Sequence, residues 1–285
     1  MGRIGIVGAG AVGAVLAARL SQHGHEVLLV GRTGPVTSGV AVVDAGKDWY
    51  YSPANFDLAD AEILFFTVKA YALNDAVYQW LPQVALASPM VILCNGYLEA
   101  VFHSLAKVFP GRLMRRGVVM CGARHEAKTG VCIATEGEVF WGGGAAAAIE
   151  AEISTLSGFN YLSVIDGVLH RKWLVNTVLN TLMAAYGLEQ NRLALNYKDE
   201  LYVLVEESCS LGKSLWPDWS LSCSEAFTDL EAVVLKTAAN FNSMAADILQ
   251  RRPTEVAYLS GLASAEYPNL YRLTQLILSR SEGLA

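Results

Sequence analysis

The 285-residue chain has little of what marks several protein classes. It has only five cysteines, an odd number without a C-x-x-C pair, so neither a disulfide framework nor a zinc or other metal site is indicated. We therefore expect a cytoplasmic protein, kept in a reducing compartment. The chain also has no long basic run and a formal net charge of −6, which argues against a nucleic-acid partner.

Long uninterrupted apolar stretches are missing as well. Residues 4–20 are apolar enough to suggest a signal peptide, but glycines at positions 5, 8, 10 and 13 interrupt them, and a strand, turn and helix explain them better. The other apolar runs carry charge or glycine, so we predict no membrane span. What the chain does have is 53% hydrophobic residues, enough for a large core and one or two domains.

The first clear pattern is a glycine-rich segment between a strand and a helix. The apolar run 3–7 leads into G-A-G-A-V-G, then into an Ala/Leu-rich helix ending at Gly24 and a second strand at 26–30. This is the context that a dinucleotide-binding loop requires: its glycines permit a tight turn, approach of a pyrophosphate and close helix packing. We expect cofactor contacts at Gly8, Ala9, Gly10, Ala11, Val12 and Gly13; the alternative is a tight turn without a ligand.

The choice of cofactor depends on the end of the second strand, Val30-Gly31-Arg32. An NAD-selective site usually places an acidic residue there to bind the ribose 2′-hydroxyl. No acidic residue occurs between Val27 and Thr37, whereas Arg32 offers a cation for a 2′-phosphate. We therefore predict NADP(H) rather than NAD(H), with a solvated loop arginine as the alternative.

Further strands and helices predict a doubly wound sheet. We expect strands at 61–68, 90–93 and 161–165, more strands of the same sheet within 117–144, a hairpin or loop insertion at 36–58, and helices at 98–109 and 145–156. Ligands of such sheets lie beyond the carboxyl ends of the strands, which Lys69 and Asn95 follow. Lys69 is a candidate for cofactor phosphate or ribose and Asn95 for nicotinamide ribose or substrate; ordinary loop hydrogen bonds are the alternative.

After Asp166 the pattern becomes helical almost to the end of the chain. The expected helices lie at 168–186, 198–215, 225–250, 254–266 and 270–281. We therefore predict an α/β fold with two domains. Residues 1–165 would form a Rossmann-type domain that binds NADP(H), and residues 166–285 an all-α domain that holds substrate and catalytic groups. A homodimer through the apolar helical domain is plausible.

The first helix of the second domain carries polar residues among apolar ones. In R-K-W-L-V-N-T-V-L-N at 171–180, Lys172, Asn176 and Asn180 are four residues apart and so run along one helix face. A helix that is apolar on its other sides is usually buried, which makes Lys172 a candidate cleft-facing amine. The alternative is a lysine that buries its stem while its amine reaches solvent.

Two further polar groups occur later in this domain. Ser243 is spaced three and four residues from Asn240 and Asp247 on the predicted long helix. Thr254 and Glu255 follow Pro253 and fit the start of a helix, where the helix dipole favours a carboxylate. Capping alone would also explain Glu255.

Several of these motifs occur together in one known family. They are G-A-G-A-V-G, T-V-K-A at 67–70, C-N-G at 94–96, the 171–180 helix, and S-M at 243–244 followed by P-T-E at 253–255. In this combination, which spans essentially the whole chain, the sequence resembles the ketopantoate reductase (2-dehydropantoate 2-reductase) family. The resemblance implies a Rossmann domain, a helical domain, an active site between them, and reduction of ketopantoate to pantoate with NADPH on the route to pantothenate and coenzyme A.

The resemblance also implies roles for individual residues. Lys172 matches the catalytic lysine, which would donate a proton as an alkoxide develops, and Glu255 matches a carboxylate that would hold a hydroxyl group and tune the lysine. The implied substrate contacts are Asn95, Asn176, Asn180 and Ser243. The implied cofactor contacts, besides the glycine-rich loop, are Arg32, Lys69, Asn95 and the backbone of Ala123.

The chain departs from the family pattern at 97–99, at Gln190, and at Ala257 and Ser260. Two alternatives to ketopantoate reduction therefore stay open. One is a related NADPH-dependent reductase of another 2-oxo acid or of an imine. The other is an NADPH-binding sensor without turnover.

Overall fold

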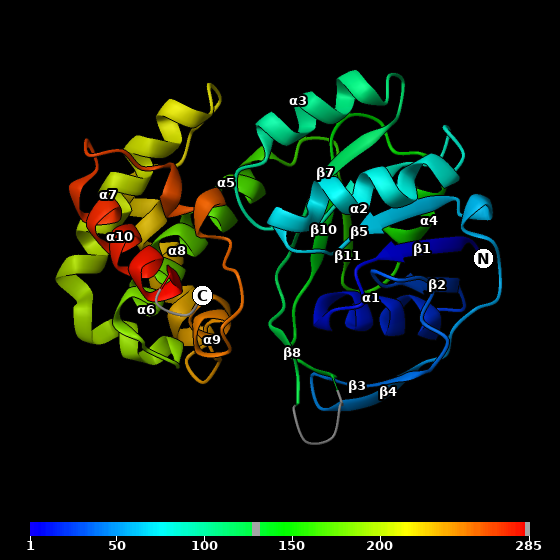
Figure 1. Cartoon of the computed structure of the whole chain (residues 1–285), viewed down its shortest axis with the longest axis horizontal. Coiled ribbons are helices and arrows are strands. Elements are labelled where there is room, and N and C mark those ends of the chain that lie inside the picture. The colour runs from blue at the N-terminus through cyan, green and yellow to red at the C-terminus, as the bar shows by residue number, and fades with distance from the viewer. Residues whose placement is uncertain (127–131, 283–285) are drawn as a thin grey trace. The chain divides into compact units, whose positions relative to one another are not determined.

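A computed structural model describes residues 1–126 and 132–282, which form two compact units (Figure 1). The first unit comprises Met1–Cys94 and Glu99–Ile165, and the second comprises Asn95–Leu98 and Asp166–Ala285. The segment 95–98 thus belongs with the second unit, although it directly follows a strand region of the first.

Among its described residues, the first unit contains two β-sheets. The strands are β1 (Arg3–Val7), β2 (Glu26–Val30), β3 (Val40–Asp44), β4 (Lys47–Tyr51), β5 (Ile63–Phe66), β6 (Met90–Ile92), β7 (Met114–Val119), β8 (Ala123–His125), β9 (Cys132–Ala134), β10 (Val139–Gly142) and β11 (Phe159–Leu162). The larger sheet has the order β11-β10-β7-β6-β5-β1-β2, and all neighbours are parallel except β7 and β10. The smaller sheet has the order β4-β3-β9-β8.

Helices cover both faces of the larger sheet. They are α1 (Ala11–Gln22), α2 (Leu73–Trp80), α3 (Glu99–Val108) and α4 (Ala148–Ile153). In β5, Ile63 and Phe65 share a core with α1, whereas Leu64 and Phe66, which point to the opposite face, are also fully buried. The strand β1 lies between β2 and β5, so the chain turns to opposite sides of β1. This arrangement confirms the predicted doubly wound Rossmann-type sheet.

The smaller sheet corrects one prediction. The segment 36–58 does form a hairpin, β3–β4, but not all strands within 117–144 continue the larger sheet. Only β7 and β10 do so, while β9 pairs in parallel with β3 and buries Cys132 and Ala134 in the core shared with α1. Helix α1 therefore contacts strands of both sheets (Figure 1). The alternation of apolar residues identifies a strand but not its partner, which is why the sequence assigned β8 and β9 wrongly.

Helices form the described part of the second unit, apart from one isolated bridge between Gln190 and Phe241. They are α5 (Asp166–Val175), a π-helical turn (Asn176–Asn180), α6 (Thr181–Tyr186), α7 (Lys198–Leu215), α8 (Cys223–Lys236), α9 (Ser243–Leu249) and α10 (Pro268–Glu282). The helices predicted at 168–186, 198–215 and 270–281 are confirmed to within two residues. In the part of the chain that the structure describes, no helix is both long and apolar enough to cross a bilayer.

The single helix predicted at 225–250 was wrong, because the chain divides it into α8 and α9. The Asn242 side chain caps α9: its Oδ1 accepts hydrogen bonds from two backbone N–H groups of the first turn, at 3.1 and 3.2 Å. Asparagine competes for backbone hydrogen bonds and therefore favours helix starts over helix interiors. Asn240 consequently lies in the connecting turn, not on one helix face with Ser243 and Asp247.

The helix predicted at 254–266 was also wrong. Two short 3-10 turns stand there, Val256–Tyr258 and Ser260–Leu262. Glu255 immediately precedes the first of them, so it does not occupy the first turn of an α-helix. The dipole of a long helix therefore does not account for the position of this carboxylate.

Candidate functional site

The glycine-rich loop between β1 and α1 uses its three glycines in three ways. Gly8 has a φ of +119°, and a Cβ there would lie 2.7 Å from the Thr67 hydroxyl oxygen. A Cβ on Gly13 would lie 1.9 Å from the Gly8 carbonyl oxygen, so only glycine permits this close packing of helix and turn. A Cβ on Gly10 would meet nothing within 4 Å. The space beside Gly10 is thus open to a ligand, as a pyrophosphate site requires.

The start of α1 is suited to bind an anion. Gly10 occupies the N-cap position, and within the described chain no side chain caps this helix and no acidic residue lies in its first turn. The first backbone N–H groups of a helix have no partner inside the helix and carry partial positive charge. Together with the open space at Gly10, they fit the pyrophosphate of a dinucleotide.

Two side chains hold the backbone of this loop in place. The Thr67 hydroxyl, directly after β5, donates a hydrogen bond to the Gly8 carbonyl at 2.9 Å. The Cys132 thiol of β9 donates to the Ala11 carbonyl at 3.3 Å, and burial raises the pKa of Cys132 to about 12, which keeps it a neutral donor. The sequence analysis assigned neither role. For Thr67 a signal existed, since it follows a buried strand beside the strand of the loop.

Three other predicted cofactor residues, Arg32, Lys69 and Ala123, lie in the same unit, whereas Asn95 belongs to the second. Arg32 is exposed after β2, and its carbonyl accepts a hydrogen bond from Gln79 Nε2 of α2 at 3.1 Å. Lys69 is half-buried at the start of the 3-10 turn Ala70–Ala72. Ala123 is the first residue of β8 in the smaller sheet. Their contacts with a cofactor stay predictions.

In the second unit, the predicted polar helix face runs through the π-helical turn. Lys172 is half-buried in α5, while Asn176 and Asn180, at the two ends of the π turn, are each 8% exposed. In a regular α-helix, residues four apart drift around the axis. A π turn rotates less per residue, because it closes i→i+5 hydrogen bonds, and it returns Asn180 toward the line of Lys172. This turn, a feature common at functional sites, was not predicted from the sequence.

Asn95 and Glu255 complete a cluster of polar side chains in this unit. Asn95 Nδ2 donates to Glu255 Oε2 at 3.4 Å, and Asn95 Oδ1 accepts from Asn176 Nδ2 at 3.3 Å. A carboxylate can only accept, so the nitrogen of Asn95 faces Glu255, its oxygen faces Asn176, and Asn176 keeps Oδ1 as an acceptor for another group. Both contacts exceed the usual range of about 2.7–3.2 Å. The structure thus brings together three of the predicted site residues, in contacts weak enough to rearrange.

The loop that carries Asn95 packs directly on the turn that follows Glu255. The Tyr97 N–H donates to the Tyr258 carbonyl at 2.8 Å. Gly96 has a φ of +103°, and a Cβ there would lie 2.5 Å from the Cβ of Tyr258. The glycine of the C-N-G motif therefore permits this close approach.

Asn180 has a partner that the sequence analysis missed. Asn242 Nδ2 donates to Asn180 Oδ1 at 2.8 Å, and Asn242 is only 4% exposed. Ser243, the predicted substrate residue, follows Asn242 as the first residue of α9 and is exposed. The signal for Asn242 was its capping chemistry, which the prediction of one continuous helix concealed.

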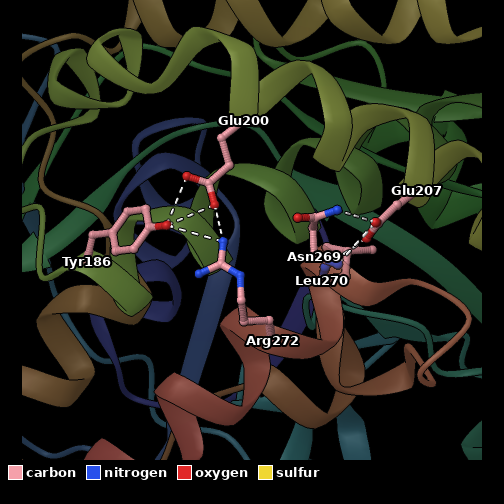
Figure 2. A network of polar contacts seen from close by, with 6 residues as sticks. All are labelled: Tyr186, Glu200, Glu207, Asn269, Leu270 and Arg272. Atoms are coloured by element: carbon pink, nitrogen blue, oxygen red, sulfur yellow. Dashed lines mark hydrogen bonds and ion pairs between the residues drawn. The ribbon is translucent and has the colours of Figure 1, made fainter.

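Polar contacts fix the far end of the helix that carries Asn176 and Asn180. Figure 2 shows Tyr186, the last residue of α6, beside Glu200 of α7 and Arg272 of α10. Burial raises the pKa of Tyr186, whose hydroxyl keeps its proton and donates to both Glu200 oxygens, at 2.8 and 2.9 Å. Nearby, Glu207 accepts hydrogen bonds from the backbone N–H groups of Asn269 and Leu270 and so caps α10 (Figure 2). Through Tyr186, the helix that carries Asn176 and Asn180 is thus connected to both α7 and α10.

Comparison with known proteins agrees with this architecture. The family model described as "Ketopantoate reductase PanE/ApbA" matches residues 4–145, and its C-terminal counterpart matches residues 164–266. The chain belongs to the ketopantoate reductase family. As a member it is an oxidoreductase that acts on a CH–OH group, and the cofactor of the family is NADP(H).

Individual relatives are distant but similar over most of their length. The 2-dehydropantoate 2-reductase of Salmonella typhi is 25% identical over 269 residues, covering 91% of this chain and 86% of the relative. That of Vibrio cholerae is 27% identical over 265 residues, covering 90% and 88%. A D-mandelate dehydrogenase solved with NADH and anilino(oxo)acetate superimposes with a TM-score of 0.83 at 21% identity, covering 99% of both chains. This last likeness shows a shared fold.

Among the residues of this chain that the structure describes, no group of three His, Cys, Asp or Glu side chains is arranged to hold a metal ion.

Proposed function

We propose that this family member reduces ketopantoate to pantoate with NADPH in the cytoplasm, as a step of pantothenate synthesis. The observation that carries the proposal is the polar cluster of the second unit, where Asn95 links Glu255 to Asn176. Asn176 lies on the π turn that continues α5, the helix of Lys172. The cluster offers a carboxylate and free amide groups to a small molecule with a carboxylate, a carbonyl and a hydroxyl group, as ketopantoate has.

Each residue of the two regions has its own role in the proposed reaction. The glycine loop and the start of α1 bind the cofactor, with Arg32 and Lys69 on its phosphates or ribose and the Ala123 backbone as a further contact. NADPH, when bound, supplies the hydride. Lys172 stabilises the negative charge that develops on the substrate oxygen and donates a proton to it. Asn176, Asn180 and Ser243 orient the substrate, Asn95 contacts both substrate and cofactor, and Glu255 accepts from a substrate hydroxyl.

A panel of 2-oxo acids tests the substrate, with loss of NADPH absorbance as the readout. We expect ketopantoate to give the highest kcat/KM of the panel. A higher value for a 2-oxo acid without a hydroxyl group would contradict ketopantoate but keep the reductase. Tight NADPH binding without turnover of any 2-oxo acid or imine would instead favour a sensor.

One observation favours a second substrate class, 2-oxo acids with an aromatic side chain. Tyr97, two residues after Asn95, is half-buried and packs edge-to-face on Trp216 with 4.9 Å between ring centroids. Aromatic rings prefer this arrangement, and a substrate ring would extend it. The panel should therefore include phenyl-substituted 2-oxo acids.

A further inference from the structure

We propose that Asn242 is a positioning residue for the reductase: it fixes the amide of Asn180 so that Asn180 presents Nδ2, a donor, to the substrate. The inference rests on the proposed function, because it takes Asn180 as a substrate contact. Asn242 itself need not touch the substrate, since it acts through Asn180.

The orientation of both amides follows from the backbone. The group of Asn242 that caps α9 receives two backbone N–H donors, so it must be the oxygen. Its nitrogen therefore faces Asn180, 2.8 Å away, and the atom of Asn180 that receives this donor must also be the oxygen. Asn180 Nδ2 is left to bind elsewhere, and it hydrogen-bonds to no other described residue. The start of α9 thus dictates which end of the Asn180 amide is offered to a ligand.

Because both side chains are buried, this orientation of the Asn180 amide is strongly favoured over the flipped one. Asn242 and Asn180 are 4% and 8% exposed, and their hydrogen bond is shorter than the 3.3 Å contact of Asn176 with Asn95. Rotating the Asn180 amide would set two NH₂ groups face to face and leave both without an acceptor in a buried place, which is unfavourable. Asn180 therefore selects a ligand atom that accepts, such as a carboxylate or carbonyl oxygen, over one that donates.

Two substitutions separate positioning from capping. Asn242→Asp keeps an N-cap of equal strength but replaces the donor that faces Asn180 by an acceptor, so Asn180 should turn its nitrogen toward the new carboxylate. Asn242→Ser keeps a cap without adding charge, but its side chain is too short to hold Asn180. We expect the KM for the best 2-oxo acid to rise about tenfold or more in Asn242→Asp and less in Asn242→Ser. The NADPH affinity, measured by fluorescence titration, should change little in both, and the melting temperature should change little in Asn242→Asp, where Asn180 keeps a hydrogen-bond partner.

The control is Ser222→Ala, which removes the cap of α8 in the same unit. Ser222 Oγ accepts from the Glu225 N–H at 3.3 Å. This variant should lower the melting temperature and leave KM unchanged, the reverse of Asn242→Asp. If Asn242→Asp does not fold, the KM of Asn242→Ser decides.

Asn180→Ala distinguishes failure of the inference from failure of the proposed function. We expect this variant to raise KM, and Asn242→Asp to add little in the double variant, because both remove the same contact. A normal KM in both Asn242 variants together with a raised KM in Asn180→Ala would overturn the positioning role alone. A normal KM in Asn180→Ala would overturn the substrate contact, and the positioning role with it.

Discussion

The two candidate binding regions of this protein are constructed in opposite ways. The glycine loop of the first unit offers backbone N–H groups, and its glycines matter because they lack a Cβ. A Cβ would enter the open space at Gly10, and at Gly13 it would lie 1.9 Å from the Gly8 carbonyl oxygen. The second unit offers side chains: Asn95, Asn176 and Glu255 orient one another, and Asn242 orients Asn180. A backbone site should fail when an atom is added, and a side-chain site when a hydrogen-bonding group is removed or exchanged.

Lys172→Ala should give the largest effect and tests the side-chain region. Loss of a proton donor that also stabilises developing charge typically lowers the rate roughly 10²–10⁴-fold. NADPH affinity should stay the same, because the glycine loop is in the other unit. Turnover and NADPH titration on the same preparation provide the measurement, and unchanged turnover would eliminate the proposed role of the amine.

Gly10→Ala and Gly13→Ala test the backbone region, and they should differ from each other. Gly13→Ala forces an atom against the Gly8 carbonyl, and we expect it to cost about 1–3 kcal/mol or more of stability. Gly10→Ala has free space around the new atom, so stability should change by less than about 1 kcal/mol, whereas the NADPH Kd should rise about tenfold or more. Urea unfolding and fluorescence titration separate the two. Wild-type NADPH affinity in Gly10→Ala would show that the ligand does not approach this loop.

Arg32→Ala tests whether one side chain contributes to cofactor binding in the first unit, where the other contacts come from the backbone. A hydrogen bond between charged groups is worth about 1.5–3 kcal/mol, so NADPH affinity should fall about 10- to 100-fold. NADH affinity should hardly change, because NADH lacks the 2′-phosphate. The matched control is Gln79→Ala, which removes the hydrogen bond to the Arg32 carbonyl and should have a smaller effect in the same direction. Equal losses for both cofactors would argue against a 2′-phosphate contact.

The smallest effect is expected at His25, which lies in neither region. Burial lowers the pKa of His25, whose Nδ1 accepts the Gly2 N–H at 3.1 Å. The unfolded chain, with a pKa of about 6.5, takes up a proton first as the pH falls, so this contribution to stability is present above about pH 6.5 and is lost as the pH falls through the lower folded pKa. The free energy of unfolding should therefore drop less in His25→Gln than in the wild type between about pH 7.5 and 5. Parallel profiles would contradict this, and NADPH affinity should not change.

The difference between the two regions also explains which features of the protein could be predicted from its sequence. The glycine loop, α7 and the alternation of strands and helices typical of a doubly wound sheet depend on residues close together in the chain, and their patterns are visible there. The contact of Asn95 with Glu255 joins residues 160 positions apart, which no local pattern encodes. The π turn, the partner strands of β8 and β9, and the break before α9 likewise depend on tertiary packing or on which of two local preferences prevails. The supporting roles of Thr67 and Asn242 were therefore not predicted, and the roles of the predicted site residues stay predictions.

The assignment of residues 95–98 to the second unit has a practical consequence for dissecting the protein. The chain passes from one unit to the other after residues 94, 98 and 165. A fragment excised at Asp166 would lose Asn95, a donor to Glu255, and the Tyr97 N–H that binds the Tyr258 carbonyl. Residues 166–285 alone therefore do not make up the complete second unit. Expressing this unit by itself would require adding residues 95–98 to the fragment.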